Sequence, residues 1–152
     1  MILRKTAIPV LVLIASAACQ RTSPRQSSVP AGFLTSAEQA IEQAREQNKP
    51  VLMFFTAKWC PSCRQLKDST LTDPAVLSRL SAFIPVSIDI DKQKETTLEY
   101  NANARKFGGV GIPNMWFLSP GGERLSHVIG YKTPQELSAV MDSVRQVIGG
   151  KP

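Results

Sequence analysis

The chain has 152 residues, of which 43% are hydrophobic and 20% are charged. This length suits one domain of ordinary size, and the apolar share excludes a disordered or collagen-like protein. The chain has 18 basic and 12 acidic residues, which give a formal net charge of +6. The basic residues form no run and no stripe with aromatic residues, so the pattern excludes a nucleic-acid partner.

The first 18 residues have the layout of a bacterial secretory signal peptide. Arg4 and Lys5 supply a charged start, and an apolar stretch over residues 7–18 ends in the small residues Ser16-Ala17-Ala18. This stretch is too short to span a bilayer comfortably, which takes ~20 residues. We therefore expect residues 1–18 to be a signal peptide and the protein to be exported.

Cys19 resembles the lipid-acceptor cysteine of bacterial lipoproteins, although Ser16 stands where that pattern has an aliphatic residue. The resemblance implies a lipid anchor on the periplasmic side of a bacterial membrane; the alternative is an ordinary secreted protein. Residues 20–30 are rich in Ser, Pro and Arg, which is typical of a flexible linker. We expect residues 19–34 to be the lipid-attachment cysteine and a tether, and residues 35–152 to be the folded domain.

The first half of the domain alternates helical and extended patterns. Ser36 and Gln39 stand in capping-box register, and Asp73-Pro74 is a typical helix start. The unbroken apolar run from Val51 to Phe55 indicates a central strand that is covered on both faces. The pattern predicts helices over residues 36–47, 64–69 and 74–80, and strands over 51–55 and 84–90.

The second half predicts a helix, a hairpin and a final helix. The first helix covers residues 93–107 and ends at Gly108-Gly109; the hairpin has strands over 114–118 and 124–129. Residues 133–136 cap the last helix, in which one apolar face comprises Leu137, Val140, Met141, Val144 and Val147. The order of elements predicts an α/β fold, a mixed central β-sheet with helices on both faces.

The pair Cys60 and Cys63 is the candidate site, because WCPSC directly follows the predicted central strand and opens a helix. Two cysteines three residues apart at a helix start share one face, with Cα atoms ~5–6 Å apart, a distance that a disulfide can bridge. The helix N-terminus favours an anion, so we expect Cys60 to be the more acidic thiol and the nucleophile. Cys63, one turn into the helix, is expected to be the resolving thiol.

Other uses of the cysteine pair lack partners in the sequence. A structural zinc site needs four ligands, and beyond the pair the chain offers only Cys19 and His127. Haem attachment requires a histidine after the second cysteine, where Arg64 stands. A redox pair without metal or organic cofactor is favoured; an inert disulfide and metal transfer are the alternatives.

WCPSC together with the later Gly111-Ile112-Pro113 resembles the thioredoxin superfamily. The segments KPVLMFF, LTDPAV, IDID and GVGIPNMWFL look most like the carboxy-terminal periplasmic domain of the thiol:disulfide interchange protein DsbD and related small exported thioredoxin-like proteins. The resemblance covers about residues 35–148. It implies a thioredoxin-like fold and disulfide exchange with protein substrates and an upstream redox partner.

The resemblance also implies roles for individual residues. Cys60 matches the family's nucleophile, Cys63 its resolving thiol and Trp59 the ring beside the site, which we expect to shield it. Pro113 matches a proline with a cis peptide bond, and the backbone of Ile112 before it would receive an extended substrate. We accordingly expect the substrate to meet Trp59, Pro61, Ser62, Ile112 and Pro113.

The chain departs from the family pattern at one buried position. Many members have an acid six residues before the nucleophile, to which proton transfer from the resolving thiol is attributed; this chain has Phe54 there. Pro85 stands where we expect the lysine that often accompanies that acid. Because the acid and the lysine are both absent, neither is left as an unpaired buried charge. It leaves Cys63 without an identified proton acceptor, and we expect the resolving step to rely on water.

Several other conspicuous residues have structural interpretations. We expect His127 to be a strand histidine rather than a base or ligand, and Trp116 and Phe117 to be core residues. Asp89 and Asp91 follow a predicted strand and are typical of a turn.

Together these patterns predict an exported, lipid-anchored thiol-disulfide oxidoreductase that acts as a monomer. Its resemblance to a reductive domain favours the reductive direction. The alternative is a thioredoxin-like binding module, such as a metal-delivery or assembly chaperone, that holds partners on its Ile112-Pro113 face without turnover.

Overall fold

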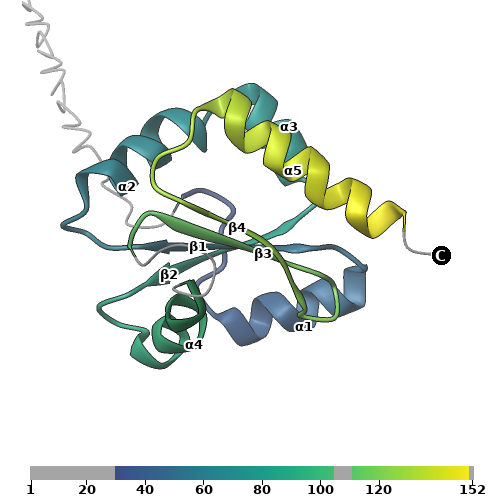
Figure 1. Ribbon diagram of the computed structural model, residues 1–152, viewed down its shortest axis with the longest axis horizontal. Helices are drawn as coiled ribbons and strands as arrows, with labels where there is room; N and C mark the ends of the chain where they lie inside the picture. Colours follow the sequence, from purple (N-terminus) through teal and green to yellow (C-terminus); the bar gives the residue numbers. More distant parts are fainter. Residues whose placement is uncertain (1–29, 105–110, 151–152) are drawn as a thin grey trace, which may run out of the picture.

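The computed structural model describes residues 30–104 and 111–150, and in these ranges it contains one four-stranded sheet with helices on both sides (Figure 1). The elements are α1 (Ala37–Gln47), β1 (Val51–Thr56), α2 (Pro61–Gln65), the π-helix η1 (Leu66–Thr70), α3 (Pro74–Leu80), β2 (Ile84–Asp89), α4 (Lys94–Ala104), β3 (Asn114–Leu118), β4 (Arg124–Ile129) and α5 (Pro134–Gly149). The predicted α/β fold is confirmed. The predicted end of α4 at residues 105–109 lies outside the described ranges.

The sheet is mixed, with strand order β2-β1-β3-β4. β1 pairs in parallel with β2 and antiparallel with β3, and β3 continues into the predicted hairpin with β4. All six residues of β1 are buried, as predicted for a central strand. Figure 1 shows α1 and α4 on one face of the sheet and α2, α3 and α5 on the other.

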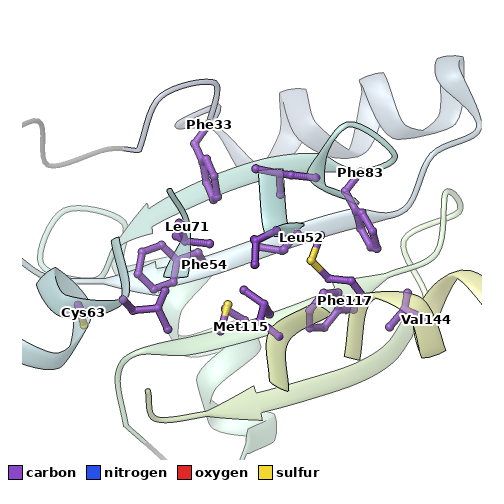
Figure 2. Close-up of a cluster of buried hydrophobic side chains, with 14 of the residues drawn as sticks. Phe33, Leu52, Phe54, Cys63, Leu71, Phe83, Met115, Phe117 and Val144 are labelled. Carbon is purple, nitrogen blue, oxygen red and sulfur yellow. The ribbon is translucent and has the colours of Figure 1, made fainter. Parts of the chain in front are cut away.

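Side chains alternate along β1 between two hydrophobic clusters, one on each face of the sheet. Met53 and Phe55 contribute to the cluster beneath α1. Leu52 and Phe54 contribute to the other cluster, which also contains residues of α2, η1, α3 and α5 (Figure 2). We call this second face of the sheet the redox face, because Cys63 belongs to its cluster.

The predicted helix starts have the expected caps. The side chain of Ser36 accepts a hydrogen bond from the Gln39 amide at 3.2 Å, and Asp73 accepts one from the Ala75 amide at 2.8 Å. At the start of α5, Thr133 begins a complete capping box with Glu136. These local bonds satisfy amides that a helix leaves unpaired at its N-terminus, which explains where the helices begin.

One residue of the predicted apolar face of α5 lies outside the core. Val147 is 55% exposed, whereas Leu137, Met141 and Val144 are buried and Ile148 packs against them. With 3.6 residues per turn, Ile148 continues the line of the buried residues and Val147 falls beside it. The prediction for Val147 is therefore wrong.

The folded domain begins earlier than the predicted boundary at residue 35. Phe33 is buried in the cluster on the redox face (Figure 2). Leu34 forms a parallel bridge with Val86 at the edge of β2; its amide donates to the Pro85 carbonyl at 2.9 Å. The predicted signal peptide and Cys19 lie outside the described residues. No helix within the described ranges is both long and apolar enough to cross a membrane.

Candidate redox site

Cys60 is the N-cap residue of α2, and Pro61 occupies the first helical turn. A proline is well suited to this turn because its fixed φ is helical and it has no amide hydrogen to leave unpaired. The Cys60 Sγ accepts a hydrogen bond from the Cys63 amide at 3.1 Å. The end of β1 and the start of α2 therefore place Cys60 where a helix N-terminus favours negative charge on sulfur.

Cys60 and Cys63 form a disulfide, with Cα atoms 5.3 Å apart as their spacing predicts. Both cysteines are buried: Cys60 is 3% exposed and Cys63 is 0% exposed, so Cys60 has what little exposed surface the pair retains. The Ser62 hydroxyl lies 3.8 Å from the Cys60 Sγ. This arrangement suits the expected roles of attacking and resolving thiol, which remain predictions.

The peptide bond between Ile112 and Pro113 is cis, as the family resemblance implies. β3 begins at Asn114, which pairs with Phe55 near the end of β1. Pro113 therefore lies at the end of the sheet from which the chain leaves β1 for Cys60. Its carbonyl accepts a hydrogen bond from the Gly130 amide at 2.8 Å, which joins it to the end of β4.

The side chain of Trp59 is held by Asp91, for which the sequence predicted only a role in a turn. Its indole Nε1 donates to Asp91 Oδ2 at 2.9 Å, although the side chain is 63% exposed. The Asp91 amide in turn donates to Asp89 Oδ1 at 3.1 Å, which confirms the predicted turn. Asp91 and Trp59 are 32 residues apart, and only the pairing of β2 with β1 brings them together.

The residue beside Phe54 on β2 is Ser87 and not Pro85. The parallel register pairs Phe54 with Ser87, and Pro85 with Leu52. Pro85, which we expected in place of the lysine, is therefore not beside Phe54 in the sheet, and the residue that is beside Phe54 is a buried serine. Counting along the sequence could not detect this, because the register depends on how the strands meet in space.

Lys67 lies in η1, about one turn beyond Cys63. Burial lowers the pKa of Lys67, the carboxylates of Asp68 and Asp89 act in the opposite sense, and the cation of Arg64 adds to the lowering.

Trp116, Phe117 and His127 lie where the sequence predicted them, in the core and on a strand. Trp116 and Phe117 are core residues. His127 on β4 stacks on Trp116 with ring centroids 4.5 Å apart, and burial lowers the pKa of His127. Trp116 faces the cluster beneath α1, away from the disulfide. In the described part of the chain, no three His, Cys, Asp or Glu residues group to hold a metal ion.

The sheet order, the disulfide at the start of the helix after the central strand and the cis proline at the same sheet end define a thioredoxin fold. A family model described as a thioredoxin-like domain matches residues 37–145. The chain belongs to this thioredoxin-like family.

The relatives of the chain include thiol:disulfide interchange proteins, among them DsbD 1 and TxlA. The chain is 36% identical over 93 residues to DsbD 1 of Pseudomonas aeruginosa, a match that covers 60% of this chain and 15% of that protein. It is 30% identical over 122 residues to TxlA of Synechococcus elongatus, with 79% of this chain and 60% of that protein covered. The chain thus corresponds to a small part of DsbD 1.

Solved structures share the fold. A thioredoxin from Thermus thermophilus superposes with a TM-score of 0.59 at 25% identity, covering 76% of this chain and 85% of that one. The oxidised DsbD carboxy-terminal domain of Neisseria meningitidis gives a TM-score of 0.57 at 23% identity, covering 74% and 99%. At that identity the second comparison shows the fold alone.

In the reduced protein, we expect iodoacetamide to alkylate Cys60 roughly tenfold faster than Cys63, because Cys63 is buried and the helix N-terminus favours the Cys60 thiolate. A short pulse at neutral pH followed by peptide mass spectrometry measures the ratio. Protein unfolded in urea is the control and should label both cysteines equally. Equal labelling of the folded protein would contradict the assignment.

Proposed function

We propose that the protein is a thiol:disulfide oxidoreductase that exchanges disulfides with protein thiols through Cys60 and Cys63. The observation that carries the proposal is the Cys60–Cys63 disulfide at the start of α2, with Cys60 at the N-cap position of the helix. The interchange proteins among its relatives support the same chemistry. The reaction needs no metal and no organic cofactor.

The reductive reaction proceeds in two exchanges. The Cys60 thiolate, which the Cys63 amide stabilises, attacks one sulfur of a substrate disulfide. A bond forms between Cys60 and the substrate, and the other substrate sulfur leaves as a thiolate. Cys63 then loses its proton and attacks the Cys60 Sγ, which re-forms the protein disulfide and releases the second substrate thiolate. Two electrons pass from the cysteine pair to the substrate.

The proposed substrate surface comprises the residues around Cys60. Trp59, Pro61 and Ser62 flank Cys60, and the cis peptide bond of Ile112-Pro113 lies at the same end of the sheet. An extended segment of a partner protein can pair with the backbone before Pro113 while its cysteine meets Cys60. This geometry favours protein substrates.

The two candidate functions differ in whether a covalent adduct forms. We expect reduced Cys63→Ser protein, incubated with insulin, to accumulate a mixed disulfide, because the serine cannot release the partner. Non-reducing electrophoresis and mass spectrometry detect the adduct. Cys60→Ser is the matched control and should form far less. If Cys63→Ser forms no adduct, the protein is a binding module instead.

We further propose that the protein works as a reductase, as its resemblance to a reductive domain suggests. The cysteine pair should then have a potential near or below about −230 mV, closer to thioredoxin than to oxidising isomerases. Equilibration with glutathione buffers and trapping of the thiols measure the potential. A value above about −180 mV would assign the opposite direction.

We also propose that residues 1–18 direct export, that Cys19 is lipidated and that the monomeric domain acts on the periplasmic side of a bacterial membrane. The support is the charged start, the short apolar stretch and the small residues before Cys19. More than one acyl chain on Cys19 would give stable attachment.

In bacteria that express the full chain, an alkyne analogue of palmitate should label the wild-type protein and not Cys19→Ala, because Cys19 is the proposed acceptor. Fluorescence of the purified protein after coupling of a dye to the alkyne measures the labelling. Cys60→Ser removes a different cysteine and should remain labelled. An unlabelled wild-type protein would refute the lipid anchor.

A further inference from the structure

A short segment between β4 and α5 is bonded to both sides of the redox site. The Gly130 amide donates to the Pro113 carbonyl at 2.8 Å, so the segment begins against the cis proline. Two residues further on, the Lys132 carbonyl accepts a hydrogen bond from Thr70 Oγ1 at 2.6 Å. Thr70 ends the continuous helical run of α2 and η1, which carries the disulfide. Two hydrogen bonds therefore join the cysteine helix to the cis proline through residues 130–132, which we call the bridging segment.

The local form of the helix places Thr70 for this contact. η1 is a π-helix, in which the Leu71 amide donates to the Leu66 carbonyl at 2.9 Å. Single π-helical turns are rare and are frequent at functional sites, and each holds one more residue than an α-helical turn. The Thr70 side chain is 0% exposed, and 62 residues separate it from its partner Lys132. Removal of the hydroxyl would leave the Lys132 carbonyl without this partner, which is costly where water is excluded.

The bridging segment is stiffened by its own bonds, so a shift at one end reaches the other. Lys132 Nζ donates to the carbonyls of Ile129 at 3.0 Å and Tyr131 at 3.4 Å. Gly130 has a φ of 79°, which favours glycine and turns the chain sharply away from β4. The hydroxyls of Tyr131 and Ser69 lie 3.3 Å apart, but this second link to η1 is exposed, where water can replace either partner. The buried threonine therefore provides the main link.

We propose that Thr70 is a positioning residue for protein substrates. Its hydroxyl fixes the bridging segment, and through it the backbone at Pro113, at the distance from Cys60 that an extended substrate requires. The inference rests on the proposed function, in which a partner pairs with the backbone before Pro113 while its cysteine meets Cys60. It adds a residue outside the proposed substrate surface to those that determine which disulfides react.

The spacing matters because one substrate segment must meet two fixed points at once. Its backbone pairs beside the cis proline, and its sulfur must reach Cys60. Neighbouring residues of an extended chain are ~3.3 Å apart, so a shift of the cis proline by a fraction of that distance misaligns the sulfur. A misplacement of ~1 Å can lower a rate by as much as ~100-fold. A small disulfide that does not pair with the backbone is insensitive to this spacing.

The test compares a protein disulfide with a small one. All proteins are full-length and carry Cys19→Ala, which leaves Cys60 and Cys63 as the only cysteines. Each is reduced, freed of reductant and mixed with excess insulin or excess 5,5′-dithiobis(2-nitrobenzoate). Acid quenching with mass spectrometry for insulin, and absorbance for the small reagent, give the two second-order rate constants.

Thr70→Val should lower the rate constant for insulin roughly tenfold and leave that for the small reagent unchanged. Valine has nearly the shape of threonine but no hydroxyl, so the Lys132 carbonyl loses its partner and the bridging segment shifts. Amide hydrogen exchange at Gly130 should accelerate in the same variant, because its bond to Pro113 is loosened. Thr70→Ala also lacks the hydroxyl, places no branched apolar group against the carbonyl, and has the same expected result.

Matched variants separate positioning from a general loss of structure. Thr70→Ser keeps the hydroxyl and should retain the wild-type rate constant for insulin. Thr72→Val removes a nearby hydroxyl that bonds only to the carbonyls of Asp68 and Ser69 in its own turn, and it should leave both rate constants unchanged. Circular dichroism reports that each variant is folded.

Two results would overturn the inference. In one, Thr70→Val and Thr70→Ala react with insulin as fast as the wild type. In the other, both rate constants fall together, as expected if the hydroxyl only stabilises the helix that carries the cysteines. The proposed function fails in a different way: the wild-type protein reacts with the small reagent and does not reduce insulin at all.

Discussion

The burial of β1 on both faces is the constraint on which the rest of the structure depends. Because β1 pairs with β2 on one side and β3 on the other, three connections meet where it ends. The chain passes there to Cys60, the cis Ile112-Pro113 bond precedes β3, and the turn of Asp89 and Asp91 follows β2. The redox pair and its surroundings are thus assembled by strand pairing, not by the cysteine motif alone.

Local features of the sequence predicted most of the fold and the reactive centre. Ser36, Asp73 and Thr133 mark helix starts because each caps amides within three residues of itself. The apolar run of β1 and the spacing of Cys60 and Cys63 are equally local. Such signals are readable because the atoms that interact are close along the chain.

The features that sequence reasoning missed depend on contacts between distant segments. The residue that pairs with Phe54 on β2 is Ser87, because the two strands meet in a parallel register that no short segment of sequence encodes. The same register brings Asp91 to Trp59 and Asp89 to Thr56. The burial of Phe33 depends on a core that later elements complete, so no local pattern in the sequence marks Phe33 as part of the domain.

The hydrogen bond between Trp59 and Asp91 has a consequence for encounters with other proteins. An aromatic side chain that projects into water usually samples several rotamers, and an arriving protein must restrict them. Here the restriction has already occurred on folding, because the indole nitrogen is anchored. A large, rigid aromatic surface therefore stands beside Cys60, and the entropic penalty of capturing a partner is correspondingly smaller.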